Sequence, residues 1–95
     1  MDRNNLQFII DTYGINTQED IAIEELAKLQ KAILKHRRYK NKDTERGIID
    51  EIADVEIMLE QLKIIYSCHD NVKKRVEYKI DREIKRIKNK YNIAD

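Results

Sequence analysis

The absence of proline is the feature that most constrains how this chain can fold. Its 95 residues include no proline and only two glycines, Gly14 and Gly47. Proline and glycine are the residues that most readily interrupt a helix, so the segments between the two glycines can run as long, unbroken helices. We therefore expect an all-α protein that forms one domain over residues 1–95.

Apolar residues spaced by three and four predict four helices, at about residues 3–13, 18–38, 45–67 and 70–91. Gly14 stands where the first helix closes, and Thr17 is the expected N-cap of the second. The basic run 35–43 is predicted to end the second helix and to form a mobile connection, and closure of residues 35–42 over phosphates is the alternative. The expected cap region of the fourth helix is 69–71. The third helix is apolar over more than a narrow seam, which predicts that it is the most buried element.

Each of the two middle helices carries an apolar stripe. The stripe of the second helix contains Ile21, Ala22, Leu26, Leu29, Ile33 and Leu34, and that of the third contains Ile48, Ile49, Ile52, Val55, Leu59 and Leu62. Hydrophobic residues make up 41% of the chain, enough to cover one face of several helices but not to enclose a large core. We therefore expect a helical bundle completed by homo-oligomerisation, as a dimer or a tetramer.

The distribution of charge and the number of cysteines limit the cellular compartment and the partners that the chain can have. Residues 73–90 carry nine basic and three acidic side chains, a net charge of +6, whereas the whole chain has a net charge of +1. An acidic body with a basic terminal helix suits a ligand that carries metal and phosphate, or an acidic neighbour. Cys68 is the single cysteine, which excludes an internal disulfide and favours a reducing compartment. Without a long apolar run or a signal-peptide pattern, the chain is expected to be soluble and cytoplasmic, with no membrane partner.

Acidic residues recur at helical spacing beside these apolar stripes. Glu51 and Asp54 are three residues apart and share a helix face, and Glu24 and Glu25 have a similar setting on the preceding helix. If the two helices pack antiparallel, these carboxylates can face one another. Hard oxygen ligands without cysteine or nearby histidine indicate Mg²⁺ or Mn²⁺ rather than zinc. Spacing alone favours solvated faces or salt bridges over a metal site, because structural ion pairs are the commoner cause of such clusters.

The segments AIEELAKLQKAI (22–33) and IIDEIADVEIMLEQLKIIY (48–66) resemble the MazG-like branch of the all-α nucleoside triphosphate pyrophosphohydrolases, in its short phage and Gram-positive bacterial form. The family signature is E-E-x-x-E, a spacer, and E-x-x-D. Glu24 and Glu25 match the opening pair, and Glu51 and Asp54 match the second half. The likeness continues through VEYKIDREIKRI (76–87), so it covers nearly the whole chain.

This resemblance implies the hydrolysis of a (deoxy)nucleoside triphosphate to the monophosphate and pyrophosphate. It implies Mg²⁺, with Mn²⁺ as an alternative ion, held by Glu25, Glu51 and Asp54. Glu24 is then the candidate catalytic residue, which would position or deprotonate the attacking water. Two basic residues one turn apart on the last helix are candidates for binding the triphosphate, and these are Lys79 and Arg82.

The third glutamate of the first motif is missing, because Lys28 occupies its position. A protonated lysine cannot coordinate Mg²⁺, and its ammonium competes with the ion for the same carboxylates. We therefore expect weakened metal binding that the nucleotide completes. The alternative hypothesis is a catalytically inactive MazG-like oligomer that binds a nucleotide or a protein. Nucleic-acid binding through residues 73–90 is a third reading, which the acidic remainder of the chain and the lack of a helix-turn-helix signature disfavour.

Overall fold

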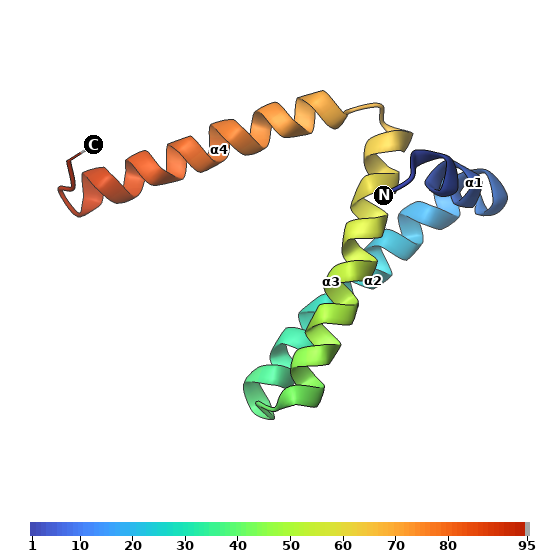
Figure 1. The fold of residues 1–95 in the computed structure, drawn as a ribbon, viewed down its shortest axis with the longest axis horizontal. Coiled ribbons are helices and arrows are strands. Elements are labelled where there is room, and N and C mark those ends of the chain that lie inside the picture. The colour runs from blue at the N-terminus through green and yellow to red at the C-terminus, as the bar shows by residue number, and fades with distance from the viewer. Residues whose placement is uncertain (95) are drawn as a thin grey trace.

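The protein consists of four helices, as the sequence predicts. The computed structural model describes residues 1–94, which form α1 (Arg3–Tyr13), α2 (Ile15–Arg38), α3 (Lys42–Ile65) and α4 (His69–Lys90) (Figure 1). No strand occurs in this part of the chain. The all-α class is therefore confirmed.

Helices α2 and α3 lie side by side and antiparallel, and together they form the body of the molecule (Figure 1). Each helix turns one row of buried or half-buried residues toward the other, with spacings that alternate between four and three. The row on α2 is Gln18, Ala22, Glu25, Leu29, Ala32 and His36, and the row on α3 is Thr44, Ile48, Glu51, Val55 and Met58. This alternation keeps one face of each helix against its neighbour over many turns, as in a coiled coil.

The connection between α2 and α3 is shorter than the sequence predicts. Helix α2 continues to Arg38 and α3 begins at Lys42, so only residues 39–41 lie outside the helices. The side chain of Asn41 accepts a hydrogen bond from the Thr44 backbone N–H at 3.0 Å, and the Thr44 hydroxyl accepts one from the Asn41 N–H at 3.2 Å. This reciprocal cap starts α3 three residues before the predicted position 45, because it satisfies N–H groups that would otherwise lack partners. The prediction of a mobile connection over 35–43 was wrong for most of that segment.

A single residue, Gly14, separates α1 from α2. Its φ of +92° lies in the region that favours glycine, and its N–H donates to the carbonyl oxygen of Ile10 at 2.7 Å. Because the chain turns at this one residue, α2 begins at Ile15 rather than at 18. The prediction of Thr17 as N-cap was therefore wrong, since Thr17 lies inside the helix.

A small core joins α1 to the end of the hairpin. Leu6 and Ile10 of α1 pack against Ile64 of α3, and all three are buried. Beside this core, Gln18 Nε2 donates to Gln61 Oε1 at 2.7 Å, and both side chains are buried. Of the helices in residues 1–94, α3 packs against each of the others and contains the most buried residues, which confirms its predicted central position.

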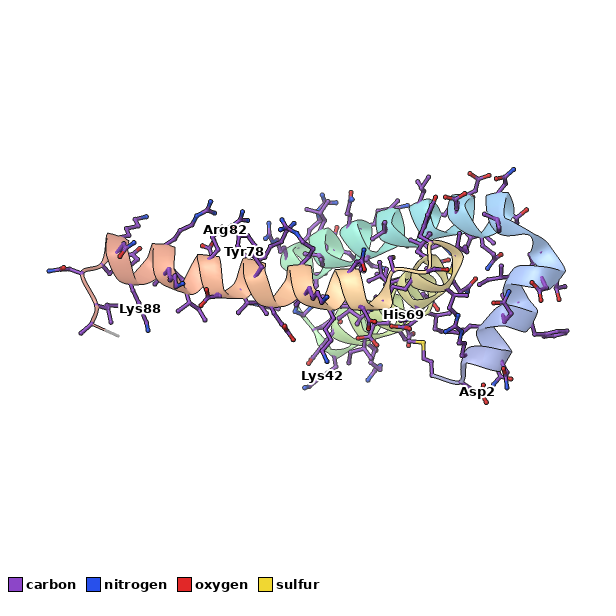
Figure 2. The ribbon with its side chains drawn as sticks, turned by 90° about the horizontal axis from the view of Figure 1, so that it is seen from above. Asp2, Lys42, His69, Tyr78, Arg82 and Lys88 are labelled. Carbon is purple, nitrogen blue, oxygen red and sulfur yellow. The ribbon has the colours of Figure 1, made fainter. Side chains whose placement is uncertain are left out.

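Helix α4 leaves the end of α3 and projects away from the hairpin (Figures 1 and 2). It begins at His69 with Cys68 as N-cap and without a side-chain capping bond, so the predicted cap residues 69–71 form its first turn. None of its residues is buried, although one face carries an apolar row made of Val76, Ile80, Ile84 and Ile87. The described chain by itself is a hairpin with two appended helices and not a closed four-helix bundle.

One side of the α2–α3 hairpin is apolar and exposed. This surface, here called the apolar face, consists of Ile23, Leu26 and Ile33 on α2 and Ile49, Ile52 and Leu59 on α3. The spacing of seven from Leu26 to Ile33 continues back to Glu19, and that from Ile52 to Leu59 continues on to Tyr66. The Tyr66 hydroxyl is hydrogen-bonded to the Glu19 carboxylate, which shows that the two rows adjoin across the hairpin.

Within residues 1–94, no helix combines the length and the apolar character that crossing a lipid bilayer requires.

Candidate functional site

Three carboxylates meet halfway along the hairpin. Glu25 of α2 and Glu51 and Asp54 of α3 each offer one oxygen, and these oxygens lie within 4.8 Å of one another. Glu25 and Glu51 belong to the facing rows of the two helices, and Asp54 lies one turn beyond Glu51 at the edge of the hairpin. The antiparallel packing thus brings together the carboxylates expected from the sequence, and we refer to them as the acidic cluster.

The acidic cluster contains carboxylate oxygens without partners. Glu25 Oε2 and Glu51 Oε2 are both buried and accept no hydrogen bond. Partial burial raises the pKa of Glu51, and the neighbouring charges of Glu25 and Asp54 raise it further. A buried oxygen without a partner costs free energy, and a hard cation is one of the groups that can satisfy it.

Lys28 supplies a positive charge at the edge of the cluster. Its Nζ lies 3.1 Å from Glu25 Oε1, one helical turn away on α2. The hydrogen bond to Glu25 and the Glu25 charge raise the pKa of Lys28, and the Glu51 and Asp54 charges act in the same direction. The ammonium is therefore held in its charged form. The Lys28 side chain is 55% exposed whereas that of Glu25 is 13% exposed, so Lys28 can swing into solvent while the carboxylate stays in place.

The donor set of the cluster suits Mg²⁺ or Mn²⁺. Mg²⁺ binds oxygen at about 2.0–2.1 Å, so two of its ligand oxygens are at most about 4.2 Å apart. The limit of 4.8 Å for the three carboxylates is slightly wider, which a small side-chain shift or an intervening water would accommodate. Mg²⁺ commonly keeps several waters and needs only one or two carboxylates in addition to substrate phosphates. The residues present therefore fit the ion.

The other predicted site residues lie outside the acidic cluster. Glu24 is exposed, and it is not among the residues whose oxygens converge. Lys79 and Arg82 lie on α4, which packs against α3 but not against α2 and extends away from the hairpin (Figures 1 and 2). The Arg82 guanidinium lies 5.7 Å from the ring centre of Tyr78 on the same helix. A single chain does not bring these two cations to the cluster, and their roles stay predictions.

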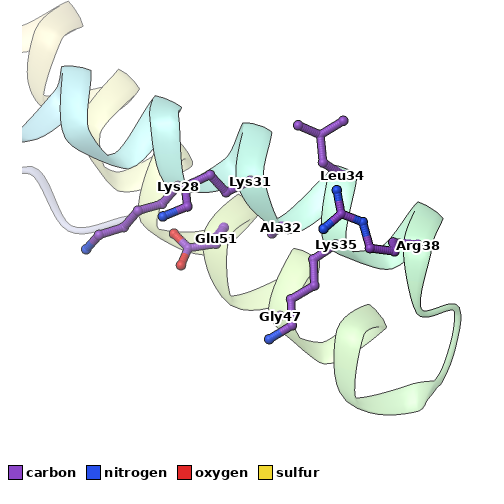
Figure 3. A pocket seen from close by; sticks show the side chains of 8 residues that line it. All are labelled: Lys28, Lys31, Ala32, Leu34, Lys35, Arg38, Gly47 and Glu51. Atoms are coloured by element: carbon purple, nitrogen blue, oxygen red, sulfur yellow. The ribbon is translucent and has the colours of Figure 1, made fainter.

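A cleft beside the acidic cluster was not anticipated from the sequence. It has a volume of about 510 Å³ and is lined by Lys28, Lys31, Ala32, Leu34, Lys35, Arg38, Gly47 and Glu51 (Figure 3). Its basic residues belong partly to the segment that was predicted to be a mobile connection. The spacing of Lys28, Lys31, Lys35 and Arg38 by three, four and three indicates a shared helix face, and this signal was present in the predicted helix 18–38.

Comparisons of the chain with protein-family models, with curated proteins and with solved structures find no match.

Proposed function

We propose that the protein is a Mg²⁺-dependent nucleoside triphosphate pyrophosphohydrolase that converts a (deoxy)nucleoside triphosphate to the monophosphate and pyrophosphate. The observation that supports this proposal is the convergence of Glu25, Glu51 and Asp54, whose oxygens lie within 4.8 Å of one another. The MazG-like resemblance of residues 22–33 and 48–66 supplies the reaction class. The basic cleft that adjoins the acidic cluster fits a substrate that carries several negative charges.

In this proposal each residue of the cluster has a separate task. Glu25, Glu51 and Asp54 would hold Mg²⁺ or Mn²⁺, and the ion would neutralise phosphate oxygens and orient a water for attack. When the ion binds, Lys28 would release Glu25, and the Lys28 ammonium would turn toward the phosphates or the solvent. Water adds to phosphorus while the bond to the pyrophosphate leaving group breaks, and the proton lost from water passes to a nearby base. Glu24, which stands next to Glu25 on α2, is the candidate for positioning that water or accepting its proton.

We also propose that the functional unit is a homo-oligomer, a dimer or a tetramer. The apolar face exposes six large aliphatic side chains along one side of the hairpin, and α4 carries a further apolar row. A second copy would cover these surfaces and complete a bundle. Opposite charges favour the same arrangement, because the nine basic residues in 73–90 of one copy can approach the acidic body of another. Such packing is also the route by which Lys79 and Arg82 of one copy would reach the nucleotide bound to another.

A second candidate function is nucleotide or protein binding without turnover. The observation that favours it is the pair between Lys28 and Glu25, which places an ammonium where the family signature has a carboxylate ligand. In this alternative, Lys28 takes the place of the metal ion and the acidic cluster is structural. The two functions differ in whether product is formed in the presence of Mg²⁺.

Pyrophosphate release from a panel of deoxynucleoside and ribonucleoside triphosphates, with Mg²⁺ or Mn²⁺, tests the proposal. We expect slow release by the native protein, loss of activity in Glu51→Gln, and unchanged activity in Glu56→Gln. Glu56 is a matched control because it is an exposed glutamate of α3 outside the cluster. A folded native protein that releases no pyrophosphate from any nucleotide would establish the non-catalytic alternative, and equal activity in the two variants would place the reaction elsewhere.

A further inference from the structure

We propose that the cleft next to the acidic cluster binds the polyphosphate chain of the nucleotide through Lys31, Lys35 and Arg38. These residues together form what we call the cationic cleft. The choice of a triphosphate as ligand rests on the proposed function. The cleft itself is argued from the arrangement of its charges and from the open space between α2 and α3.

The cations of the cleft follow one face of α2. Lys31, Lys35 and Arg38 are separated by four and three residues, so their side chains leave the same side of the helix (Figure 3). At a rise of about 1.5 Å per residue, the separation of seven positions between Lys31 and Arg38 corresponds to about 10 Å along the helix axis. Successive phosphates of an extended chain can therefore meet successive cations. Lysine provides point charges along this row, and arginine adds a planar fork for the phosphate at its end.

These cations have no carboxylate partners of their own. No aspartate or glutamate occurs between Glu25 and Asp43, and the side chains of Lys31, Lys35 and Arg38 make no ion pair within residues 1–94. By contrast, Lys42, Arg46 and Lys63 each pair with a carboxylate three residues away. Cations near the end of a helix stabilise its dipole, but this effect fades beyond the last turn and does not account for Lys31.

Gly47 keeps the cleft open from the α3 side. It lies inside α3, where glycine destabilises a helix relative to alanine. A Cβ atom added at Gly47 would meet nothing within 4 Å, so packing does not require a glycine at this position. In Figure 3, Lys35 extends from α2 across the cleft toward Gly47. The missing side chain leaves room for a ligand between the two helices.

The cationic cleft opens onto the acidic cluster, because Lys28 and Glu51 line it as well. A polyphosphate held by Lys31, Lys35 and Arg38 would therefore reach the carboxylates that bind the ion in the proposed reaction. The Glu51 carboxylate repels an anion, so the cleft should bind polyphosphate more tightly with Mg²⁺ than without it. Cations and carboxylates thus divide the recognition of one ligand between them.

The role of the positive charges is tested by measuring the binding of inorganic tripolyphosphate with isothermal titration calorimetry, with and without Mg²⁺. The double variant Lys31→Gln/Lys35→Gln should bind tripolyphosphate about tenfold more weakly than the native protein, because each exposed lysine–phosphate pair contributes a few-fold to the affinity. The matched control Arg37→Gln/Lys40→Gln removes one charge in the last turn of α2 and one just beyond it, and neither residue lines the cleft. We expect the control to change the affinity by less than about twofold. Equal weakening in both double variants, or no binding to the native protein, would overturn the proposal.

A steric test leaves the charges unchanged. Gly47→Phe should fill the cleft and weaken tripolyphosphate binding about tenfold, whereas Gly47→Ala should retain it, because only the larger side chain occupies the space. Circular dichroism checks that both variants are folded. Native affinity in a folded Gly47→Phe variant would place the ligand outside the cleft.

The outcomes separate this inference from the proposed function. Tripolyphosphate binding that depends on Lys31 and Lys35, without pyrophosphate release from any nucleotide, would support the cleft and contradict the enzyme. Pyrophosphate release that is unaffected in Lys31→Gln/Lys35→Gln would support the enzyme and contradict the cleft.

Discussion

The ammonium nitrogen of Lys28 lies 3.1 Å from Glu25 Oε1, so the chain places a cation of its own at the edge of its acidic cluster. The pair links two charges on adjacent turns of α2. It leaves Glu25 Oε2 and Glu51 Oε2 buried without hydrogen-bond partners. The cluster is therefore only partly neutralised, and further positive charge would stabilise it.

Replacing Lys28 with glutamate should strengthen metal binding and raise activity. The Lys28→Glu variant removes the competing ammonium and adds a fourth carboxylate. The ammonium removed lies 3.1 Å from Glu25 Oε1 and the carboxylate added can itself bind the ion, so a gain of about tenfold in Mn²⁺ affinity is expected. Calorimetric titration with Mn²⁺ and the pyrophosphate-release assay measure the two effects.

The same variant should become dependent on metal for its stability. Four neighbouring carboxylates repel one another, so Lys28→Glu should unfold at a lower temperature than the native protein in a chelating buffer. Mg²⁺ should reverse this loss because an ion that binds the folded state stabilises it. Lys28→Gln is the control for removal of the ammonium alone. If the melting temperature of Lys28→Glu does not change when Mg²⁺ is added, the carboxylates do not bind the ion.

The buried hydrogen bond between Gln18 and Gln61 predicts non-additive substitutions. Gln61→Leu removes the acceptor of the 2.7 Å bond and leaves the Gln18 amide buried without it. Such an unsatisfied group costs about 1–3 kcal/mol of unfolding free energy. The double variant Gln18→Leu/Gln61→Leu should recover part of this loss, because no buried amide is left without a partner. Urea unfolding of the four proteins measures the coupling, and simple additivity would argue against a buried bond.

The apolar face predicts that association depends on its central side chains. Ile52→Glu places a charge in the middle of this face and should convert an oligomer to a monomer, because burying an unpaired carboxylate is costly. Ile57→Glu is the matched control, since Ile57 is an exposed isoleucine of α3 outside the apolar face. Light scattering coupled to size-exclusion chromatography measures the mass. A native protein that is monomeric at millimolar concentration would contradict the prediction.

Glu60 should contribute to stability in a pH-dependent way. Hydrogen bonds from Lys63 and His69 hold the pKa of Glu60 below its ordinary value of 4.5. The folded state therefore favours the ionised carboxylate, and this stabilisation is present above about pH 4.5 and is lost as the pH falls through the folded-state pKa. Glu60→Gln should be less stable than the native protein by about 0.5 kcal/mol near pH 6, and the difference should be smaller at pH 3. Urea unfolding at the two pH values checks the sign, and a difference that grows on acidification would contradict it.

The helices could be predicted from the sequence because the chain lacks proline and repeats its apolar residues with helical spacing. Their ends were less predictable, because local backbone chemistry set them. Gly14 turns the chain within one residue, and Asn41 caps α3 with Thr44. Both effects lengthen the helices beyond the apolar pattern.

The faces of the helices were harder to predict than the helices themselves. Leu26, Ile33, Ile52 and Leu59 belong to the predicted apolar stripes, and each is exposed within the chain. Polar side chains such as Gln18, which is buried, take inward positions instead. A spacing of three and four identifies an apolar row, yet it does not say whether the same chain or a second copy covers that row. The acidic cluster was more predictable, since antiparallel packing of two helices leaves few other ways to place Glu25, Glu51 and Asp54.

Helix α4 has a consequence for how folding and association are coupled. It buries no residue within the chain, and a helix of 22 residues gains most of its stability from packing against other elements. In dilute solution α4 should therefore unwind while the α2–α3 hairpin stays folded. The helical signal in circular dichroism would then rise with protein concentration, and the completed secondary structure would be a property of the assembly rather than of one polypeptide.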